Sequence, residues 1–351
     1  MYKHYKTGDQ YEIVNEALDS DDLKPLIVYR SVKTGQVWVR PKEEFFSEVN
    51  GVPRFEPIKL NNNFDGQYMK LVNHILTNGR DKSDRTGVGT RSITSYSFNI
   101  DISEYFPLLT VKKTFYESVF GELVWFLKGS TCANYLTTKI WCANSSEEFL
   151  KKRGLPYLKG YIGPSYGYQW RGCSHIPGEL QWDDKYHYYT ENTYPGVDQI
   201  QYIIDEIKNN PDSRRILMSN WDVRHISSMA LPPCHVLFQV VVRGDYLDSI
   251  MYQRSADLFL GVPFNVASYS ALVYILAKLT GKKPGIITIH FGDVHIYSNH
   301  IEQAQSLNDL QIYDSPKLEI SEIDNINNIS IDHFKLIDYK CGPFIKAEMA
   351  I

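Results

Sequence analysis

The fold of this chain is organised around Met229-Ala230-Leu231-Pro232-Pro233-Cys234-His235-Val236-Leu237-Phe238-Gln239-Val240-Val241-Val242. The two prolines cannot continue a helix, because proline has no backbone N–H and its ring blocks the preceding turn. The apolar, β-branched run that follows predicts a buried strand. Cys234 therefore stands where a loop enters a strand, and a side chain at such a junction can face a cleft. A lone cysteine is more often a small buried hydrophobe, so its neighbours must decide between these interpretations.

Length, charge and cysteine content limit the classes of protein to which this chain can belong. Its 351 residues suffice for one large domain or two domains, and its net charge of -4 excludes a globally basic nucleic-acid binder. The N-terminus lacks a signal-peptide core and no run approaches the roughly 18 apolar residues of a membrane span, so we expect a cytoplasmic protein without a membrane partner. The five scattered cysteines form no C-x-x-C pair, which favours reduced thiols and no metal site.

Residues 1–60 predict a small β-rich accessory domain of unknown function, and residues 61–351 predict the main domain. Within the first, residues 26–41 carry two strand-like runs around a glycine-containing turn, which is typical of a β-hairpin. The whole pattern resembles a short bacterial domain whose function is not established. Three of its side chains suit a face that binds RNA or another partner, and ordinary packing explains them equally well: Arg30, Trp38 and Arg40.

Apolar periodicity and turn residues divide the main domain into helices and strands. Helices are predicted over residues 65–76, 116–127, 146–153, 197–208 and 265–279, and strands over 92–100, 216–219, 236–242, 247–252 and 286–291. Residues 163–171 predict an aromatic, turn-rich loop, and residues 184–195 predict a polar surface excursion. The polar run 292–300 is expected where the last strand ends.

Several polar residues stand in surroundings that indicate a binding site, although each signal is modest alone. Arg85 lies in a loop whose two glycines can bring the backbone close to a phosphate. Arg214 and Arg215 open a strand, where paired cations are costly to bury without an anion. Glu122 lies among apolar residues of a predicted helix, which suits either a helix surface or a dry cleft that would raise its pKa.

Six motifs follow one another along the main domain: Asp84-Arg85-Thr86-Gly87-Val88-Gly89-Thr90, Asp212-Ser213-Arg214-Arg215, Leu231-Pro232-Pro233-Cys234-His235, Gln253-Arg254-Ser255, Gly261-Val262-Pro263-Phe264-Asn265-Val266-Ala267-Ser268-Tyr269 and His295-Ile296-Tyr297-Ser298-Asn299-His300. Together they resemble the thymidylate synthase family over residues 64–351. The resemblance implies an α+β fold with a large mixed or antiparallel sheet at a homodimer interface, surrounded by helices. It also implies a methyltransferase that makes dTMP from dUMP with 5,10-methylenetetrahydrofolate and requires neither DNA nor a metal.

The resemblance assigns the covalent step to Cys234, whose thiolate adds to carbon 6 of uracil because carbon 5 is not nucleophilic until then. Arg254 would lie close to the thiol and favour the thiolate. Asn265 would read the pyrimidine edge, where an amide suits uracil and an aspartate would suit cytosine. Glu122 would organise proton transfers through water, with Tyr166 assisting removal of the carbon 5 proton. The other implied nucleotide contacts are Arg85, Arg214, Arg215, Arg254 and Ser255 at the phosphate, His295 and Tyr297 at the ribose, and His235 and Gln253.

In the family the arginine pair comes from the second subunit, so the resemblance implies an obligate homodimer in which Arg214 and Arg215 act in trans. The terminal carboxylate of Ile351 would close over the folate. Closure excludes water, so that hydride from the folate yields a methyl group instead of a hydroxymethyl group. The implied folate contacts are Lys112, Trp141, Asn144, Asp257, Gly261 and Phe264, and Asp257 is also implied in catalysis.

Four positions depart from the family's pattern: Cys142, Ser165, Asn220 and Cys341. Several of them are expected near the folate cavity, and a wetter cavity would favour a deoxyuridylate hydroxymethylase, in which water quenches the methylene intermediate. Trp141 and the apolar C-terminus favour methylation. A catalytically idle relative that binds nucleotide or RNA is a third alternative, although every catalytic residue type is in place.

Overall fold

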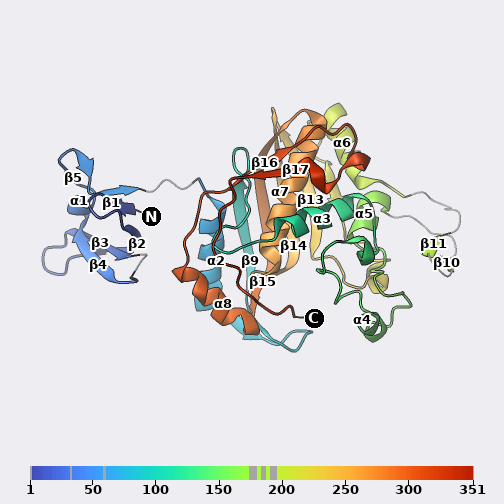
Figure 1. Ribbon diagram of the computed structural model, residues 1–351, viewed down its shortest axis with the longest axis horizontal. Coiled ribbons are helices and arrows are strands. Elements are labelled where there is room, and N and C mark those ends of the chain that lie inside the picture. The colour runs from blue at the N-terminus through green and yellow to red at the C-terminus, as the bar shows by residue number, and fades with distance from the viewer. Residues whose placement is uncertain are drawn as a thin grey trace. The chain divides into compact units, whose positions relative to one another are not determined.

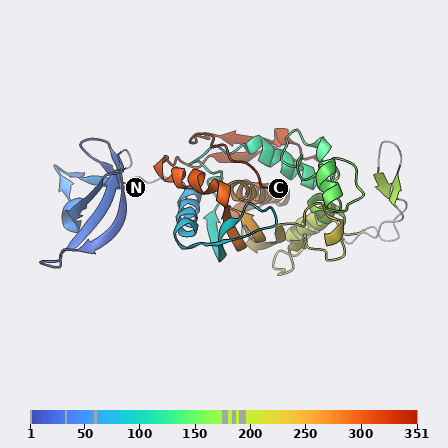
Figure 2. The ribbon, with the colours of Figure 1, turned by 90° about the horizontal axis from the view of Figure 1, so that it is seen from below.

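The computed structural model of the protein describes residues 2–31, 34–57, 61–173, 180–182, 187–189 and 196–350. Contacts divide the chain into two compact units, Met1–Asn61 and Asn62–Ile351. Figures 1 and 2 show the elements of each unit. Each unit has a hydrophobic core of its own.

The N-terminal unit is a curled antiparallel sheet with the strand order β4-β3-β2-β1-β7. The predicted hairpin is confirmed, because β3 (Pro25–Ser31) pairs with β4 (Val37–Pro41) and places Tyr29 opposite Trp38. In its small core the rings of Phe45 and Phe55 stack with their centroids 4.1 Å apart. Its other elements are β1 (Tyr2–His4), β2 (Gln10–Leu18), α1 (Lys42–Phe45), β5 (Glu48–Val49), β6 (Val52–Pro53) and β7 (Phe55–Pro57).

The main unit is built on a six-stranded mixed sheet with the order β12-β13-β14-β15-β9-β8 (Figure 1). Strands β14 and β15 run parallel, and their other neighbours in the sheet run antiparallel. Helices cover this sheet, so the predicted α+β class is confirmed. The strands are β8 (Arg80–Lys82), β9 (Thr90–Asp101), β12 (Leu217–Ser219), β13 (His235–Arg243), β14 (Tyr246–Asp257) and β15 (Lys283–Tyr297).

Helix α7 (Gly261–Thr280) is the centre of the main core and packs against β14, β15 and α3 (Tyr116–Leu127). By length and hydropathy α7 would suffice to cross a membrane, but 72% of its apolar window is buried, so the fold itself covers that surface. The remaining elements are α2 (Phe64–Asn78), α4 (Glu147–Lys152), α5 (Tyr166–Gly172), α6 (Gln199–Asn209), α8 (Ile301–Ser306), and two small sheets that pair β10 (Leu180–Trp182) with β11 (His187–Tyr189) and β16 (Lys317–Ile320) with β17 (Phe334–Ile337).

Two local predictions are wrong. The sequence predicts a loop at residues 163–171, but α5 begins at Tyr166. Tyr166 and Trp170 stand one turn apart, and both rings pack against Phe126 of α3, so the aromatic spacing marks a buried helical face. The polar run 292–300 does not follow the end of its strand, because β15 remains paired with β9 as far as Tyr297. The excursion predicted at 184–195 lies mostly outside the described residues.

Candidate active site

A cavity of about 480 Å³ opens beside Cys234 in the main unit. Its wall comes from α3, α5, β14, β15, the start of β13, the N-terminus of α7, the loops at residues 140–144 and 231–234, and the C-terminal segment. The cavity thus gathers residues from widely separated parts of the chain. The predicted site residues that line it are Glu122, Trp141, Asn144, Tyr166, Cys234, His235, Gln253, Ser255, Asp257, Gly261, Phe264, Asn265, His295 and Tyr297.

Strand geometry explains why several of these residues face the same cavity. Alternate side chains of a strand share one face, so the three lining residues of β14 lie in a row, as do the two of β15. In the parallel ladder Asp257 stands opposite His295, and in the antiparallel ladder His235 stands opposite Gln253. Because β13 begins at His235, Cys234 lies at the junction of loop and strand that the sequence predicts.

Cys234 is held between a tyrosine and an arginine. Its backbone N–H donates to Oη of Tyr166 at 2.7 Å. Arg254 donates from Nε to the carbonyl of Pro233 at 2.8 Å and from Nη2 to the carbonyl of Pro232 at 2.9 Å. These bonds leave Nη2 of Arg254 at 4.0 Å from Sγ of Cys234.

The pKa of the Cys234 thiol is raised, although a neighbouring arginine alone would lower it. Burial raises the pKa of the thiol, the charges of Arg254 and Arg85 lower it, and the charge of Asp257 raises it. Arg254 acts in the predicted direction. Burial is nevertheless the larger effect, so the thiol needs its neighbouring cation to ionise.

Glu122 of α3 borders the same cavity. Burial raises the pKa of Glu122 to about 7, and the hydrogen bond that Trp141 donates from Nε1 to Oε1 at 2.6 Å lowers it. A carboxyl with this pKa can take up or release a proton at neutral pH. Of the two interpretations offered by the sequence, the structure agrees with the cleft.

Three polar side chains of the cavity wall, those of His235, Gln253 and Asn265, form a connected group. Gln253 donates from Nε2 to Oδ1 of Asn265 at 2.9 Å and to the carbonyl of Ser255 at 3.1 Å. Burial lowers the pKa of His235 to about 4, against a hydrogen bond with Asn265 that raises it. The imidazole is therefore neutral at pH 7 and can both donate and accept a hydrogen bond.

Asp257 and Lys112 lie near the turn that leads into α7. Oδ1 of Asp257 accepts from the backbone N–H groups of Phe259 and Leu260 at 3.0 and 3.2 Å. The ammonium of Lys112 lies 4.7 Å from the centroid of the Phe259 ring, and burial lowers its pKa to about 8. Lys112 does not line the cavity, so the structure does not bring it to the wall with the other predicted folate residues.

His295 is oriented by a residue that sequence reasoning missed. Its Nδ1 lies 2.7 Å from Oδ1 of Asp293, and Asp293 also pairs with Lys82. Asp293 precedes His295 by two positions in β15, so strand alternation could have identified it. The apolar part of the wall was also missed, because such residues carry no signal that distinguishes them from core: Phe115, Phe126, Ile140, Leu231 and Leu260.

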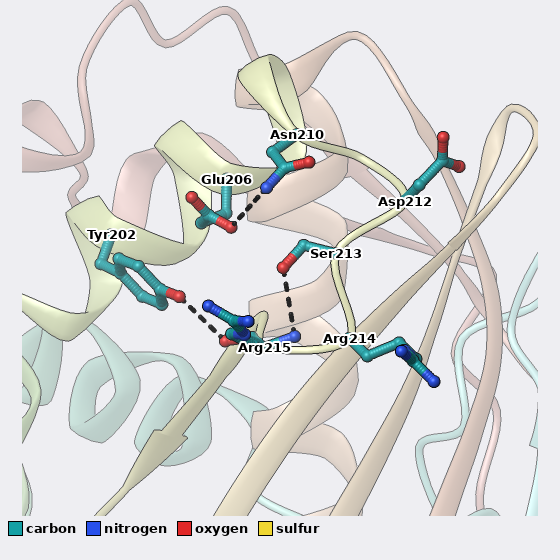
Figure 3. Close-up of a pocket in the computed structure, with 7 residues that line it drawn as sticks. All are labelled: Tyr202, Glu206, Asn210, Asp212, Ser213, Arg214 and Arg215. Atoms are coloured by element: carbon teal, nitrogen blue, oxygen red, sulfur yellow. Dashed lines mark hydrogen bonds between the residues drawn. The ribbon is translucent and has the colours of Figure 1, made fainter.

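The predicted phosphate residues do not all meet at the cavity. Arg214 and Arg215 line a second pocket of about 380 Å³, between the end of α6 and the start of β12 (Figure 3). Within it the hydroxyl of Tyr202 donates to the Arg215 carbonyl at 3.1 Å. Arg85 does not line either pocket, although its charge acts on Cys234.

The C-terminal segment supplies part of the cavity wall through Ala347 and Met349. His300 Nε2 and Asn299 Nδ2 lie 2.7 and 3.3 Å from the carbonyl of Glu348. These contacts attach the segment to the short turn that follows β15. The residue predicted to close the cavity, Ile351, lies outside the described residues.

Comparison with known proteins agrees with this arrangement, because the family model for thymidylate synthase matches residues 66–351. The chain belongs to the thymidylate synthase family. Thymidylate synthase is a methyltransferase, and members of the family bind dUMP and use methylenetetrahydrofolate. The predicted resemblance is confirmed. Residues 1–57 match a separate family described as a protein of unknown function (DUF1653).

Thymidylate synthases from two viruses and from Homo sapiens are similar to this chain. The thymidylate synthase of human herpesvirus 8 is 43% identical over 292 residues, which cover 81% of this chain and 84% of the viral protein. That of Homo sapiens is 43% identical over 290 residues, which cover 81% of this chain and 90% of the human protein. That of equine herpesvirus 2 is 42% identical over 296 residues, which cover 81% of this chain and 98% of the viral protein.

The four departures from the thymidylate synthase pattern lie in different surroundings. Ser165 and Asn220 are fully buried next to Tyr166 and His235 of the cavity wall. Among the described residues, Oγ of Ser165 and Oδ1 of Asn220 have no hydrogen-bond partner. Cys142 is exposed and Cys341 is half-buried. Buried polar atoms without a protein partner are commonly satisfied by ordered water, so two of the departures favour water behind the wall.

Proposed function

We propose that this protein catalyses the reductive methylation of dUMP to dTMP, with methylenetetrahydrofolate as co-substrate. The observation that carries the proposal is the convergence of Cys234, Glu122 and Asn265 on one cavity with a largely apolar wall. Each of the three side chains suits one requirement of the reaction: a nucleophile, a proton carrier and a group that reads the base.

Cys234 supplies the nucleophile in this proposal. Its thiolate forms a carbon–sulfur bond at carbon 6, and the electron pair of the 5,6 double bond moves towards O4 to give an enolate. Carbon 5 then becomes nucleophilic. The folate would supply the one-carbon unit and the hydride that reduces it to methyl, and would leave as dihydrofolate. Loss of the carbon 5 proton and expulsion of the Cys234 thiolate restore the double bond.

Proton movements fall to Glu122 and Tyr166. With a pKa of about 7, Glu122 holds a proton in part of the molecules at neutral pH and can exchange it through water with O4 of the base. The hydroxyl of Tyr166 lies beside the backbone of Cys234, so it is well placed near carbon 5 of a base attached to Sγ.

Base selection falls to Asn265. Its Oδ1 already accepts from Gln253, which keeps the amide in one orientation. A carbonyl oxygen accepts two hydrogen bonds, so Oδ1 can take N3–H of uracil in place of its contact with His235, while Nδ2 donates to O4. Cytosine presents the opposite pattern and would leave buried groups unpaired, which favours dUMP over dCMP. His295, oriented by Asp293, and Tyr297 are the proposed ribose contacts.

The residues present fit a folate. Trp141 and Phe264 offer apolar rings in the cavity that Cys234 lines, and Asn144, Asp257 and the backbone of Gly261 offer polar partners in the same wall. Apolar walls with a few fixed polar groups are typical of sites for flat cofactors. Lys112 does not line this cavity, and its ammonium lies over the ring of Phe259, so we assign it no direct folate contact.

We propose a homodimer in which Arg214 and Arg215 bind the phosphate in the partner's site, together with Arg85, Arg254 and Ser255 of the first chain. The proposal rests on the separation of the arginine pocket from the Cys234 cavity within one chain. Mixing an inactive Cys234→Ser protein with an inactive Arg215→Ala protein should restore part of the turnover, because mixed dimers contain one complete site. A mixture that remained inactive after subunit exchange would contradict action in trans.

Hydroxymethylation is the second candidate, and the buried oxygens of Ser165 and Asn220 are the observation that favours it. Water held behind the cavity could quench the methylene intermediate and yield 5-hydroxymethyl-dUMP.

The deciding experiment incubates the protein with dUMP and methylenetetrahydrofolate and identifies the nucleotide and folate products by mass spectrometry. The proposal expects dTMP with one dihydrofolate per turnover. Hydroxymethyl-dUMP with tetrahydrofolate would refute it in favour of the second candidate, and dUMP binding without release of the carbon 5 hydrogen would indicate an idle relative. Incubation with dCMP in place of dUMP tests the role of Asn265.

A further inference from the structure

We infer that Trp221 is a positioning residue for the nucleophile: the face of its indole holds the guanidinium of Arg254 beside the thiol of Cys234. The inference rests on the proposed function, in which Cys234 attacks the base. It assigns a role to a side chain outside the cavity wall.

The Trp221 ring is the third group that contacts the guanidinium of Arg254, after the carbonyls of Pro232 and Pro233. The guanidinium carbon lies 5.3 Å from the centroid of the Trp221 ring. The carbonyls of Pro232 and Pro233 already accept from Nη2 and Nε. Two carbonyls fix the edge of a planar cation but resist tilting only weakly, whereas an aromatic face resists tilting directly. The three contacts together keep Nη2 at 4.0 Å from Sγ.

Trp221 is itself attached to the start of β13, the strand that follows Cys234. The backbone N–H of Asn220 donates to the Val236 carbonyl at 2.8 Å, and its Nδ2 donates to the His235 carbonyl at 2.9 Å. The N–H of Trp221 lies 3.3 Å from Oγ of Ser219, to which it donates. The ring therefore keeps a fixed position relative to the thiol.

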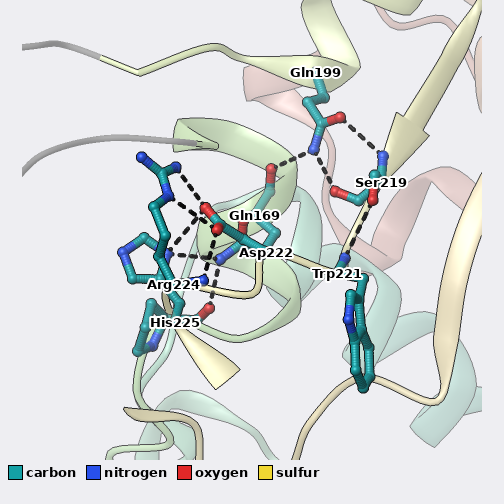
Figure 4. A network of polar contacts seen from close by, with 8 residues as sticks. Gln169, Gln199, Ser219, Trp221, Asp222, Arg224 and His225 are labelled. Carbon is teal, nitrogen blue, oxygen red and sulfur yellow. Dashed lines mark hydrogen bonds and ion pairs between the residues drawn. The ribbon is translucent and has the colours of Figure 1, made fainter. Parts of the chain in front are cut away.

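The polar residues that follow Trp221 do not share this role. Figure 4 shows the indole projecting away from the group that joins Asp222 to Arg224 and His225. Trp221 is 37% exposed, so its side chain is not required to fill the core. Its contact with Arg254 is the interaction that explains its orientation.

The cation matters because Cys234 is otherwise poorly placed to ionise. The charged and titratable groups that act on the thiol are Arg254, Arg85, Asp257, Tyr166 and Tyr297. Burial raises the pKa of the thiol, and Arg254 is the largest influence in the opposite direction. Any tilt that carries the guanidinium away from Sγ removes part of that influence.

The test is the pH dependence of alkylation of Cys234 by iodoacetamide, with the modified peptide quantified by mass spectrometry. Trp221→Leu should move the midpoint of the profile to higher pH and slow alkylation at neutral pH roughly 2- to 5-fold, the range expected for one partly exposed cation–π contact. The limiting rate at high pH should not change. Trp221→Phe should recover most of the wild-type profile, because it retains an aromatic face. Trp38→Leu, at a 48% exposed tryptophan of the N-terminal unit, is the matched control and should leave the profile unchanged.

An unchanged midpoint in Trp221→Leu would overturn the inference, and so would a midpoint raised equally in the leucine and phenylalanine variants. A changed limiting rate with an unchanged midpoint would also overturn it, since the ring would then act by shielding the thiol. Alkylation requires neither dUMP nor folate. Failure of the positioning role is therefore distinguishable from failure of the proposed function, which the product assay detects.

Discussion

Replacing Glu122 with glutamine should stabilise the folded protein at pH 8 and change its stability little at pH 5. Burial raises the pKa of Glu122 from 4.5 to about 7. The folded state therefore binds this proton more tightly than the unfolded state does, and stability falls as the pH rises from 4.5 through 7. At roughly 1.4 kcal/mol per pH unit, the ionised carboxyl costs at most about 3 kcal/mol at pH 8 and less than about 1 kcal/mol at pH 5.

Glutamine removes this cost and keeps an oxygen that can accept from Trp141 Nε1, so the local packing should persist. Urea unfolding of wild type and Glu122→Gln at pH 5 and pH 8 measures the difference directly. Glu117→Gln is the control, because Glu117 is exposed on the same helix. A variant that is destabilised at pH 8, or stabilised equally at both pH values, would refute the reasoning. Turnover should be lost in Glu122→Gln alone.

Three further predictions concern Cys234, His235 and Gly163. Cys234→Ser should abolish turnover while calorimetry still detects dUMP binding, because a hydroxyl is far weaker as a nucleophile; measurable turnover by the serine variant would contradict the assignment. NMR of the His235 ring should show it neutral down to pH 5, since burial lowers its pKa to about 4, and titration near pH 6.5 would contradict that burial. Gly163→Ala should lower the unfolding free energy by more than about 1 kcal/mol, because φ is +75° and the new Cβ would lie 2.2 Å from the Ser228 carbonyl. Gly154 has a similar φ of +68° but open space around it, so Gly154→Ala introduces the backbone strain without the steric clash. Gly154→Ala should therefore lower the unfolding free energy less than Gly163→Ala does.

Local pattern was sufficient for most elements of the fold. The hairpin at residues 26–41, the helix at 116–127 and the strand after Cys234 follow from apolar periodicity and from proline and glycine positions, which act over a few residues. The loop predicted at 163–171 failed because its aromatic residues suit both a turn-rich loop and a buried helical face. Only the packing of Tyr166 and Trp170 on Phe126 decides between these.

Some features of the site likewise follow from local sequence, and others follow only from the tertiary structure. By itself, the sequence determined the residue types of the cavity and the place of Cys234 at a strand start, because side-chain chemistry and strand alternation are local properties. Tertiary structure decided that Glu122 faces the cavity, that burial outweighs Arg254 at the thiol, and that Arg214 and Arg215 line another pocket. These outcomes depend on how the whole fold excludes solvent and on distances between segments far apart in the chain, and no local pattern encodes either quantity.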